Sequence, residues 1–210
     1  MLLGLNKKFL FIANLKTAST SIERVLAPHS ELRLTQSNYG KHQTFVEIAE
    51  RFRWLLNCVN IEDLFIFGVI RDPVDFVLSL YNSHKREQFK DNPRLYTGEM
   101  DFARFITHWV PKNADQLKNQ YLRFVSAEGR LVTNLLISYD KLDAGLEKVA
   151  AIVGVPDLTK LPTANRSPDG IGRNDLTKEQ TDWIEARFRR DKEFIARHAN
   201  RLTGAWANSN

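Results

Sequence analysis

The sequence has little cysteine, no long apolar run and no glycine in its most informative stretch, and each shortage excludes a class of protein. Cys58 is the single cysteine among 210 residues, so no internal disulfide can form. It lies in the apolar stretch 54–59, which favours a small core residue over a nucleophile. No apolar run approaches the roughly 20 residues of a membrane-spanning helix, and no targeting segment is visible. We therefore expect a cytoplasmic protein that has no membrane partner.

Other shortages concern metal and nucleic acid. No group of histidine, cysteine and aspartate has metal-ligand spacing, so we expect no metal ion. The net charge of +5 fits an anionic ligand. The positive residues are scattered through predicted helices rather than gathered in a tail, so we expect no nucleic-acid partner. Length and composition are typical of one soluble domain over residues 1–210.

Apolar runs alternate with helical patterns along the chain. This alternation predicts an α/β fold of the P-loop-like, three-layer type, in which helices flank a central and mostly parallel sheet. Strands are predicted at about 8–14, 64–70 and 131–139, with a short strand near 31–34. Helices are predicted at about 19–27, 44–57, 74–87, 101–110, 115–124, 141–153 and 177–198.

The most informative stretch is 10–21, where an apolar strand leads into Lys16 and then directly into a helical pattern. Such a turn exposes backbone N–H groups, the helix adds its positive dipole end, and the lysine adds a full charge. No glycine occurs between Gly4 and Gly40, whereas a Walker loop requires glycines. We therefore predict a different phosphate cradle, with some hydroxyls capping the helix; a solvated loop lysine is the alternative. Its members are Lys16, Thr17, Ala18, Ser19, Thr20 and Ser21.

A second cationic site follows the apolar run 64–70. That run reads as a buried parallel strand and ends in Arg71, which can bind phosphate with two parallel hydrogen bonds. Ser79 lies two helical turns further on, so both residues can face one anion. Ligands of such sheets bind beyond the carboxyl ends of the strands, so Lys16 and Arg71 are expected to share a site. The alternatives are an ion pair of Arg71 with a neighbouring aspartate and a buried, structural role for Ser79.

These motifs together resemble those of the sulfotransferases that use 3′-phosphoadenosine 5′-phosphosulfate (PAPS), in the branch of Golgi carbohydrate sulfotransferases and their bacterial homologues. The segment Lys16–Ser21 resembles the 5′-phosphosulfate loop, and Arg71-Asp72-Pro73 with Ser79 resembles the 3′-phosphate site. The segments 135–142 and 165–167 also fit, and the resemblance covers about 8–197. It implies PAPS as the co-substrate and transfer of a sulfonyl group to a hydroxyl acceptor, with a carbohydrate as the expected class.

The resemblance also implies roles for single residues. Lys16 would stabilise the leaving phosphate, and a base would remove the acceptor's proton. His42 lies in the interval where this branch has its base histidine, although it could merely precede or cap the helix at Thr44. Glu47 and His84 are the alternative bases, and we expect His84 on a helix surface.

Two loops complete the expected site. In the late loop 165–174, Arg166 or Arg173 is expected to reach the 3′-phosphate, although the Arg-Lys-Gly motif of cytosolic small-molecule sulfotransferases is missing. The acceptor would be bound by the variable loops 28–43 and 85–100. Candidate contacts there are Tyr39, Phe89, Arg94 and Tyr96.

Two other functions stay open at this point. One is a non-catalytic nucleotide- or glycan-binding module that keeps the fold without the base. The other is an ATP-dependent P-loop kinase, which would need a magnesium site and a glycine-rich loop, and neither pattern is present in the sequence.

Overall fold

The computed structural model describes residues 1–35, 40–161, 170–204 and 206. The chain divides into two compact units, and each is described by itself. Unit 1 comprises Met1–Arg71, Gln120–Ala164 and Phe194–Asn210, and unit 2 comprises Asp72–Asn119 and Asn165–Glu193.

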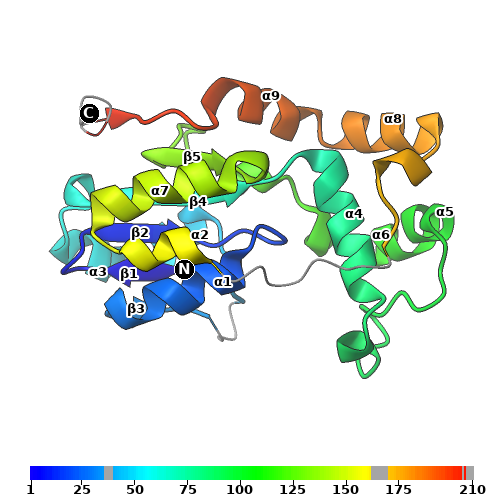
Figure 1. Cartoon of the computed structure of the whole chain (residues 1–210), viewed down its shortest axis with the longest axis horizontal. Helices are drawn as coiled ribbons and strands as arrows, with labels where there is room; N and C mark the ends of the chain where they lie inside the picture. The colour runs from blue at the N-terminus through cyan, green and yellow to red at the C-terminus, as the bar shows by residue number, and fades with distance from the viewer. Residues whose placement is uncertain (36–39, 162–169, 205, 207–210) are drawn as a thin grey trace. The chain divides into compact units, whose positions relative to one another are not determined.

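One sheet lies at the centre of unit 1 (Figure 1). In the described residues its strands are β1 (Leu2–Gly4), β2 (Phe9–Ile12), β3 (Leu32–Arg33), β4 (Phe65–Ile70) and β5 (Leu135–Ser138). Their spatial order is β3-β1-β2-β4-β5, with β2–β4 and β4–β5 parallel and β1 antiparallel to both of its neighbours. β3 therefore runs in the same direction as β2, β4 and β5. The predicted mostly parallel sheet is confirmed.

Alternate residues of the strands build two hydrophobic layers, one on each face of the sheet. Phe9, Phe11 and Phe67 face one layer, where the helices α1 (Ser19–Leu26) and α7 (Leu142–Val153) pack. Leu10 and Ile66 face the other. That layer is covered by α2 (Phe45–Arg51), α3 (Arg53–Cys58) and the end of α9 (Arg189–His198). Because a strand's side chains alternate between faces, uninterrupted apolar runs suit a sheet covered on both sides. The three-layer prediction is confirmed for unit 1.

Unit 2 is helical in its described part. Its helices are α4 (Pro73–His84), α5 (Phe102–Arg104), α6 (Val110–Lys112) and α8 (Lys178–Arg187). Aromatic side chains form much of its interior: Phe76 meets Phe188 edge-on, and Tyr81 meets Phe102 in the same way. Asp72 caps the N-terminus of α4 by accepting from the N–H groups of Val74 and Asp75, and Pro73 is the first helical residue.

Several local predictions were wrong. The helix expected at 44–57 is broken at Phe52, and the one expected at 177–198 is broken at Phe188. The stretch 115–124 forms short 3-10 turns rather than a helix. The strand β1 was missed; Asn6-Lys7-Lys8 turns it back onto β2. Cys58, expected in the core, is exposed.

Candidate anion and transfer site

The turn between β2 and α1 adopts an unusual backbone conformation. Lys16 has φ 60° and Ala18 has φ 57°, both in the left-handed region that non-glycine residues seldom adopt. These are two of the four non-glycine residues with positive φ in the described part of the chain. Such strain tends to cluster at ligand sites, where it can aim successive backbone N–H groups at an anion. The turn therefore adopts, without glycine, backbone angles that a glycine-rich loop adopts with it.

The hydroxyl residues of this turn have separate environments. Ala18, not a hydroxyl residue, is the N-cap of α1, and no side chain caps the helix. The capping role expected for these hydroxyls was therefore wrong. Thr17 is buried, and its Oγ1 donates to the carbonyl of Asn14 at 3.0 Å, which closes the turn. Ser19 and Ser21 are also buried, whereas Thr20 is exposed at the start of the helix.

Arg71 follows β4 and reaches the same turn. Its Nη1 donates to the carbonyl oxygen of Lys16 at 3.2 Å. Its guanidinium lies 4.4 Å from the centre of the Tyr139 ring, just beyond β5, a distance typical of a cation–π contact. Because β2, β4 and β5 are adjacent and parallel, these three residues meet at one edge of the sheet, as predicted for Lys16 and Arg71.

A buried amide network, which no sequence motif predicted, holds the ends of β2 and β4 together. The Asn14 amide nitrogen donates to the Val69 carbonyl and to Gln120 Oε1, at 3.1 and 2.9 Å. Gln120 Oε1 also accepts from the Arg71 N–H at 3.1 Å, and its Nε2 donates to the Arg71 carbonyl at 2.8 Å. Asn14 and Gln120 are both fully buried. The network fixes the backbone from which Arg71 projects relative to the turn.

His42 lies against the end of β2, next to this turn. Its Nδ1 is 3.4 Å from the carbonyl oxygen of Ala13. Because a carbonyl only accepts, this contact requires the proton on Nδ1, which leaves the lone pair on Nε2. Burial, with repulsion from Arg123 and Lys41, lowers the pKa of His42 to about 3. The imidazole is therefore neutral at ordinary pH, with its lone pair on Nε2.

The residue before it, Lys41, also contacts this region. Its Nζ donates to Thr20 Oγ1 at 3.0 Å and forms an ion pair with Glu23 at 2.6 Å. Lys41 and Arg123 were both missed as site residues. The motif around His42 could have drawn attention to Lys41, whereas no local pattern marks Arg123.

Of the alternative bases, Glu47 takes part in capping the N-terminus of its own helix, α2. Thr44, not His42, caps α2, in a capping box in which Glu47 Oε2 accepts from the Thr44 N–H at 2.7 Å. His84 belongs to unit 2 and is buried rather than on a surface. Its ring lies 4.4 Å from that of Phe89 and 5.1 Å from that of Trp109.

Ser79 and Arg173 belong to unit 2, whereas Lys16, Arg71 and His42 belong to unit 1. Ser79 is half-buried on α4, which removes the alternative of a buried serine. Arg173 Nε donates to Asp75 Oδ1 at 2.7 Å, and its Nη2 also pairs with Asp72. These pairs raise the pKa of Arg173. Arg173, predicted to bind an anion, is held here by the two aspartates at the start of α4.

Some residues predicted to contact the acceptor or the donor have other partners, and others lie outside the described residues. Arg94 pairs with Asp115 at 2.8 Å, and Tyr96 is half-buried. Tyr39 and Arg166 lie outside the described residues, as does the first half of the loop 165–174, up to residue 169.

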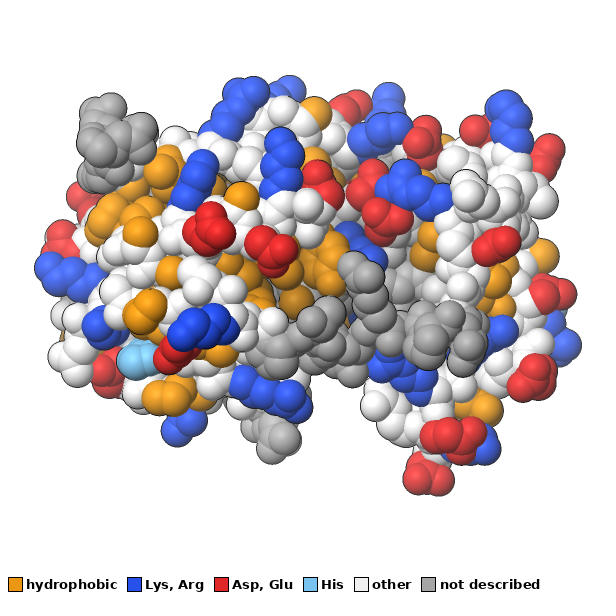
Figure 2. All heavy atoms as spheres, in the orientation of Figure 1, with side chains coloured by type: hydrophobic (Ala, Val, Ile, Leu, Met, Phe, Trp, Pro, Cys, Tyr) orange, Lys and Arg blue, Asp and Glu red, His pale blue; other side chains and the backbone are white. Residues whose placement is uncertain are grey.

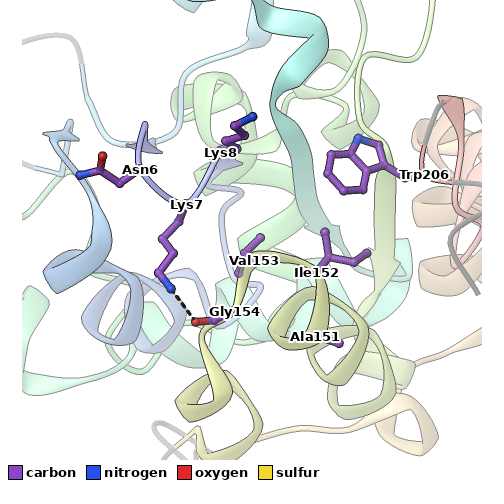
Figure 3. Close-up of a pocket in the computed structure, with 8 residues that line it drawn as sticks. All are labelled: Asn6, Lys7, Lys8, Ala151, Ile152, Val153, Gly154 and Trp206. Atoms are coloured by element: carbon purple, nitrogen blue, oxygen red, sulfur yellow. Dashed lines mark hydrogen bonds between the residues drawn. The ribbon is translucent and has the colours of Figure 1, made fainter.

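A pocket of about 300 Å³ lies at the opposite edge of the sheet, where β2 and β4 begin. It is lined by Asn6, Lys7, Lys8, Ala151, Ile152, Val153, Gly154 and Trp206 (Figure 3). Lys7 donates to the Gly154 carbonyl at 3.0 Å and so caps the end of α7. The pocket is separate from the turn that carries Lys16.

On the face drawn in Figure 2, basic and acidic side chains are interspersed. No group of three or more histidine, cysteine, aspartate or glutamate side chains could hold a metal ion in the described part. None of the helices described there is long and apolar enough to span a membrane.

Comparison with known proteins identifies the family. The sequence model of the sulfotransferase family matches residues 6–199, most of the chain. No curated protein and no solved structure gives a significant match. The chain belongs to the sulfotransferase family, whose reaction is the transfer of a sulfonyl group to an acceptor.

Proposed function

We propose that this member of the sulfotransferase family uses PAPS as its donor and transfers the sulfonyl group to a hydroxyl group of a carbohydrate. The contact between Arg71 and the carbonyl of Lys16 carries the proposal. It joins two cationic residues from neighbouring strand ends around a strained turn. A donor with two anionic ends suits such an arrangement, because each end can meet its own cation. The carbohydrate acceptor is supported by the resemblance to the carbohydrate branch of the family.

In this proposal the turn binds the 5′ end of the donor. The backbone N–H groups from Thr17 to Thr20, including that of Ala18, and the hydroxyls of Ser19, Thr20 and Ser21 surround the phosphate, and Lys16 adds its charge. The N–H of Ser21 bonds to the Ala18 carbonyl instead. Thr17 contributes its backbone only, since its hydroxyl closes the turn. Arg71 binds the 3′-phosphate. Ser79 and Arg173 are assigned to the same phosphate on the resemblance, and Arg173 must leave Asp72 and Asp75 to take part.

The transfer step needs a proton acceptor and a stabilised leaving group. The acceptor oxygen forms a bond to sulfur while the bond from sulfur to the bridging phosphate oxygen breaks. The hydroxyl proton passes to Nε2 of His42, and the electron pair stays on the phosphate oxygen. Lys16 stabilises the charge that develops there. This scheme assigns no step to a metal ion.

The donor is tested by calorimetry with adenosine 3′,5′-bisphosphate, the desulfated donor, against ATP with magnesium. Lys16→Ala should weaken binding of the bisphosphate by roughly 10- to 100-fold, as expected for a hydrogen bond to a charged group. Lys8→Ala is a matched control, because Lys8 is also a lysine with positive φ but precedes β2 at the other edge of the sheet. Arg71→Lys keeps the charge and should still weaken binding, because it loses the two-pronged geometry.

Two results would contradict the proposal. A preference for ATP with magnesium would refute the donor and favour a kinase. Equal losses in Lys16→Ala and Lys8→Ala would refute the assignment of the 5′ end of the donor to Lys16. If the bisphosphate binds tightly, release of bisphosphate from PAPS is then measured with a set of sugars and aromatic alcohols. His42→Gln should retain donor binding and lose turnover; if both survive, His42 is not the base.

A further inference from the structure

Lys41 connects the segment that carries His42 to the first turn of α1. Its Nζ lies 3.0 Å from Thr20 Oγ1 and 2.6 Å from Glu23 Oε2. The Lys41 side chain is only 20% exposed and that of Glu23 only 8%, so the ion pair is largely withdrawn from solvent. Lys41 is thus held in place by Glu23 while it contacts Thr20.

The direction of the hydrogen bond to Thr20 has a chemical consequence. An ammonium group can only donate, so the Thr20 oxygen is the acceptor and its own hydrogen is turned toward another acceptor. Thr20 is exposed and is the second residue of α1, a position where helix N-termini receive anions. Lys41 therefore fixes the hydroxyl of Thr20 as a donor.

We infer that Lys41 is a positioning residue for the sulfonyl donor: it acts through Thr20, whose hydroxyl it orients toward the donor's 5′-phosphate. The inference rests on the proposed function. It assigns Lys41 a role in donor affinity. Lys41 belongs neither to the turn Lys16–Ser21 nor to the proposed base, His42. Lys16 remains the cation that meets the anion itself.

A purely structural role is the competing explanation, in which Lys41 only neutralises the buried carboxylate of Glu23. One oxygen of that carboxylate, Oε1, is buried and has no hydrogen-bond partner among the described residues. Lys41→Met alone would therefore leave a poorly compensated buried charge and could unfold the protein. The double variant Lys41→Met/Glu23→Gln removes both charges, keeps the net charge unchanged and avoids this difficulty.

The test is a mutant cycle on the affinity for adenosine 3′,5′-bisphosphate. We expect the charge-neutral pair Lys41→Met/Glu23→Gln to weaken binding roughly three- to tenfold, the range of one ordinary hydrogen bond. Thr20→Val should weaken binding at least as much, and Thr20→Ser should retain wild-type affinity. In the Thr20→Val background the pair should change affinity by less than about twofold, because the group through which Lys41 acts is gone. Glu23→Gln alone is the control for the loss of the carboxylate.

Two results would overturn the inference. Equal losses in the wild-type and Thr20→Val backgrounds would show that Lys41 does not act through Thr20. Wild-type affinity in the pair, with only a lower melting temperature, would leave Lys41 a structural ion-pair partner. If the wild-type protein does not bind the bisphosphate, the proposed donor is itself refuted, a result distinct from both.

Discussion

Replacing His42 with asparagine should remove the part of the protein's loss of stability in acid that this histidine causes. Burial of the imidazole, with repulsion from Arg123 and Lys41, lowers the pKa of His42 from an ordinary 6.5 to about 3. Between these two pH values the unfolded chain binds a proton that the folded chain excludes. As far as His42 is concerned, the free energy of unfolding is therefore at its full value above pH 6.5 and falls as the pH is lowered toward 3.

The size of the effect follows from the shift. Each pH unit below 6.5 costs about 1.4 kcal/mol, so the folded state loses about 2 kcal/mol at pH 5.0 through His42 alone. Asparagine does not titrate and can still donate to the carbonyl of Ala13, so the variant should lack this loss. The free energy of unfolding is compared by urea denaturation at pH 7.5 and pH 5.0.

A matched control is His108→Asn, because His108 is exposed and its replacement touches no buried site. The wild type and this control should lose about 2 kcal/mol more than His42→Asn between the two pH values. Equal losses in all three proteins would refute the argument that His42 is held neutral in the fold. Such a result would also remove the support for His42 as an unprotonated base at neutral pH.

Three further substitutions test the contacts and the backbone conformation that hold the site residues in place. Gln120→Leu should lower the free energy of unfolding by about 2–4 kcal/mol, because the N–H and carbonyl of Arg71 both lose a buried partner; a urea titration that shows under about 0.5 kcal/mol would contradict this. Ala18→Gly should raise the melting temperature by roughly 1–2 °C, since glycine adopts positive φ without the cost that alanine incurs, and a decrease would show that the loop is not strained there. Asp75→Asn should tighten binding of adenosine 3′,5′-bisphosphate a few-fold if Arg173 is a donor ligand, at a stability cost below about 1 kcal/mol; calorimetry that shows no change would remove Arg173 from the site.

Local sequence patterns predicted the strands that position the site. Residues 64–70 form an uninterrupted apolar run, and a strand buried on both faces needs such a run. Arg71 follows β4 directly and Lys16 lies four residues beyond the end of β2, so parallel pairing of the two strands brings them to one edge of the sheet. That part of the site required no knowledge of long-range contacts.

Long-range and purely polar contacts could not be predicted in this way. Gln120 bonds to Asn14 across 106 residues, and neither residue belongs to a motif. The strand β1 is only three residues long, too short to show a periodic pattern, and it was not predicted. The pairing of Arg173 with two aspartates depends on the path of a loop that approaches α4 from about 100 residues away. The tertiary structure determines these pairs, because a buried polar group forms a hydrogen bond with whichever polar group the fold brings near it.

The turn that carries Lys16 shows how binding and folding depend on each other here. Two non-glycine residues with positive φ cost about 1–2 kcal/mol each, and the surrounding contacts must offset this cost. One of those contacts is the bond from Arg71 to the carbonyl of Lys16. Arg71 therefore has two roles, since it holds the turn in shape and is also the proposed ligand of the 3′-phosphate.

Loss of Arg71 should consequently weaken the binding of both ends of the donor. Gln120→Leu separates the two effects, because it leaves the guanidinium present while loosening the backbone of Arg71. If Gln120→Leu weakens bisphosphate binding as much as Arg71→Lys does, then the shape of the turn dominates donor affinity. If it weakens binding far less, the direct contact of the guanidinium dominates, and the amide network serves stability alone.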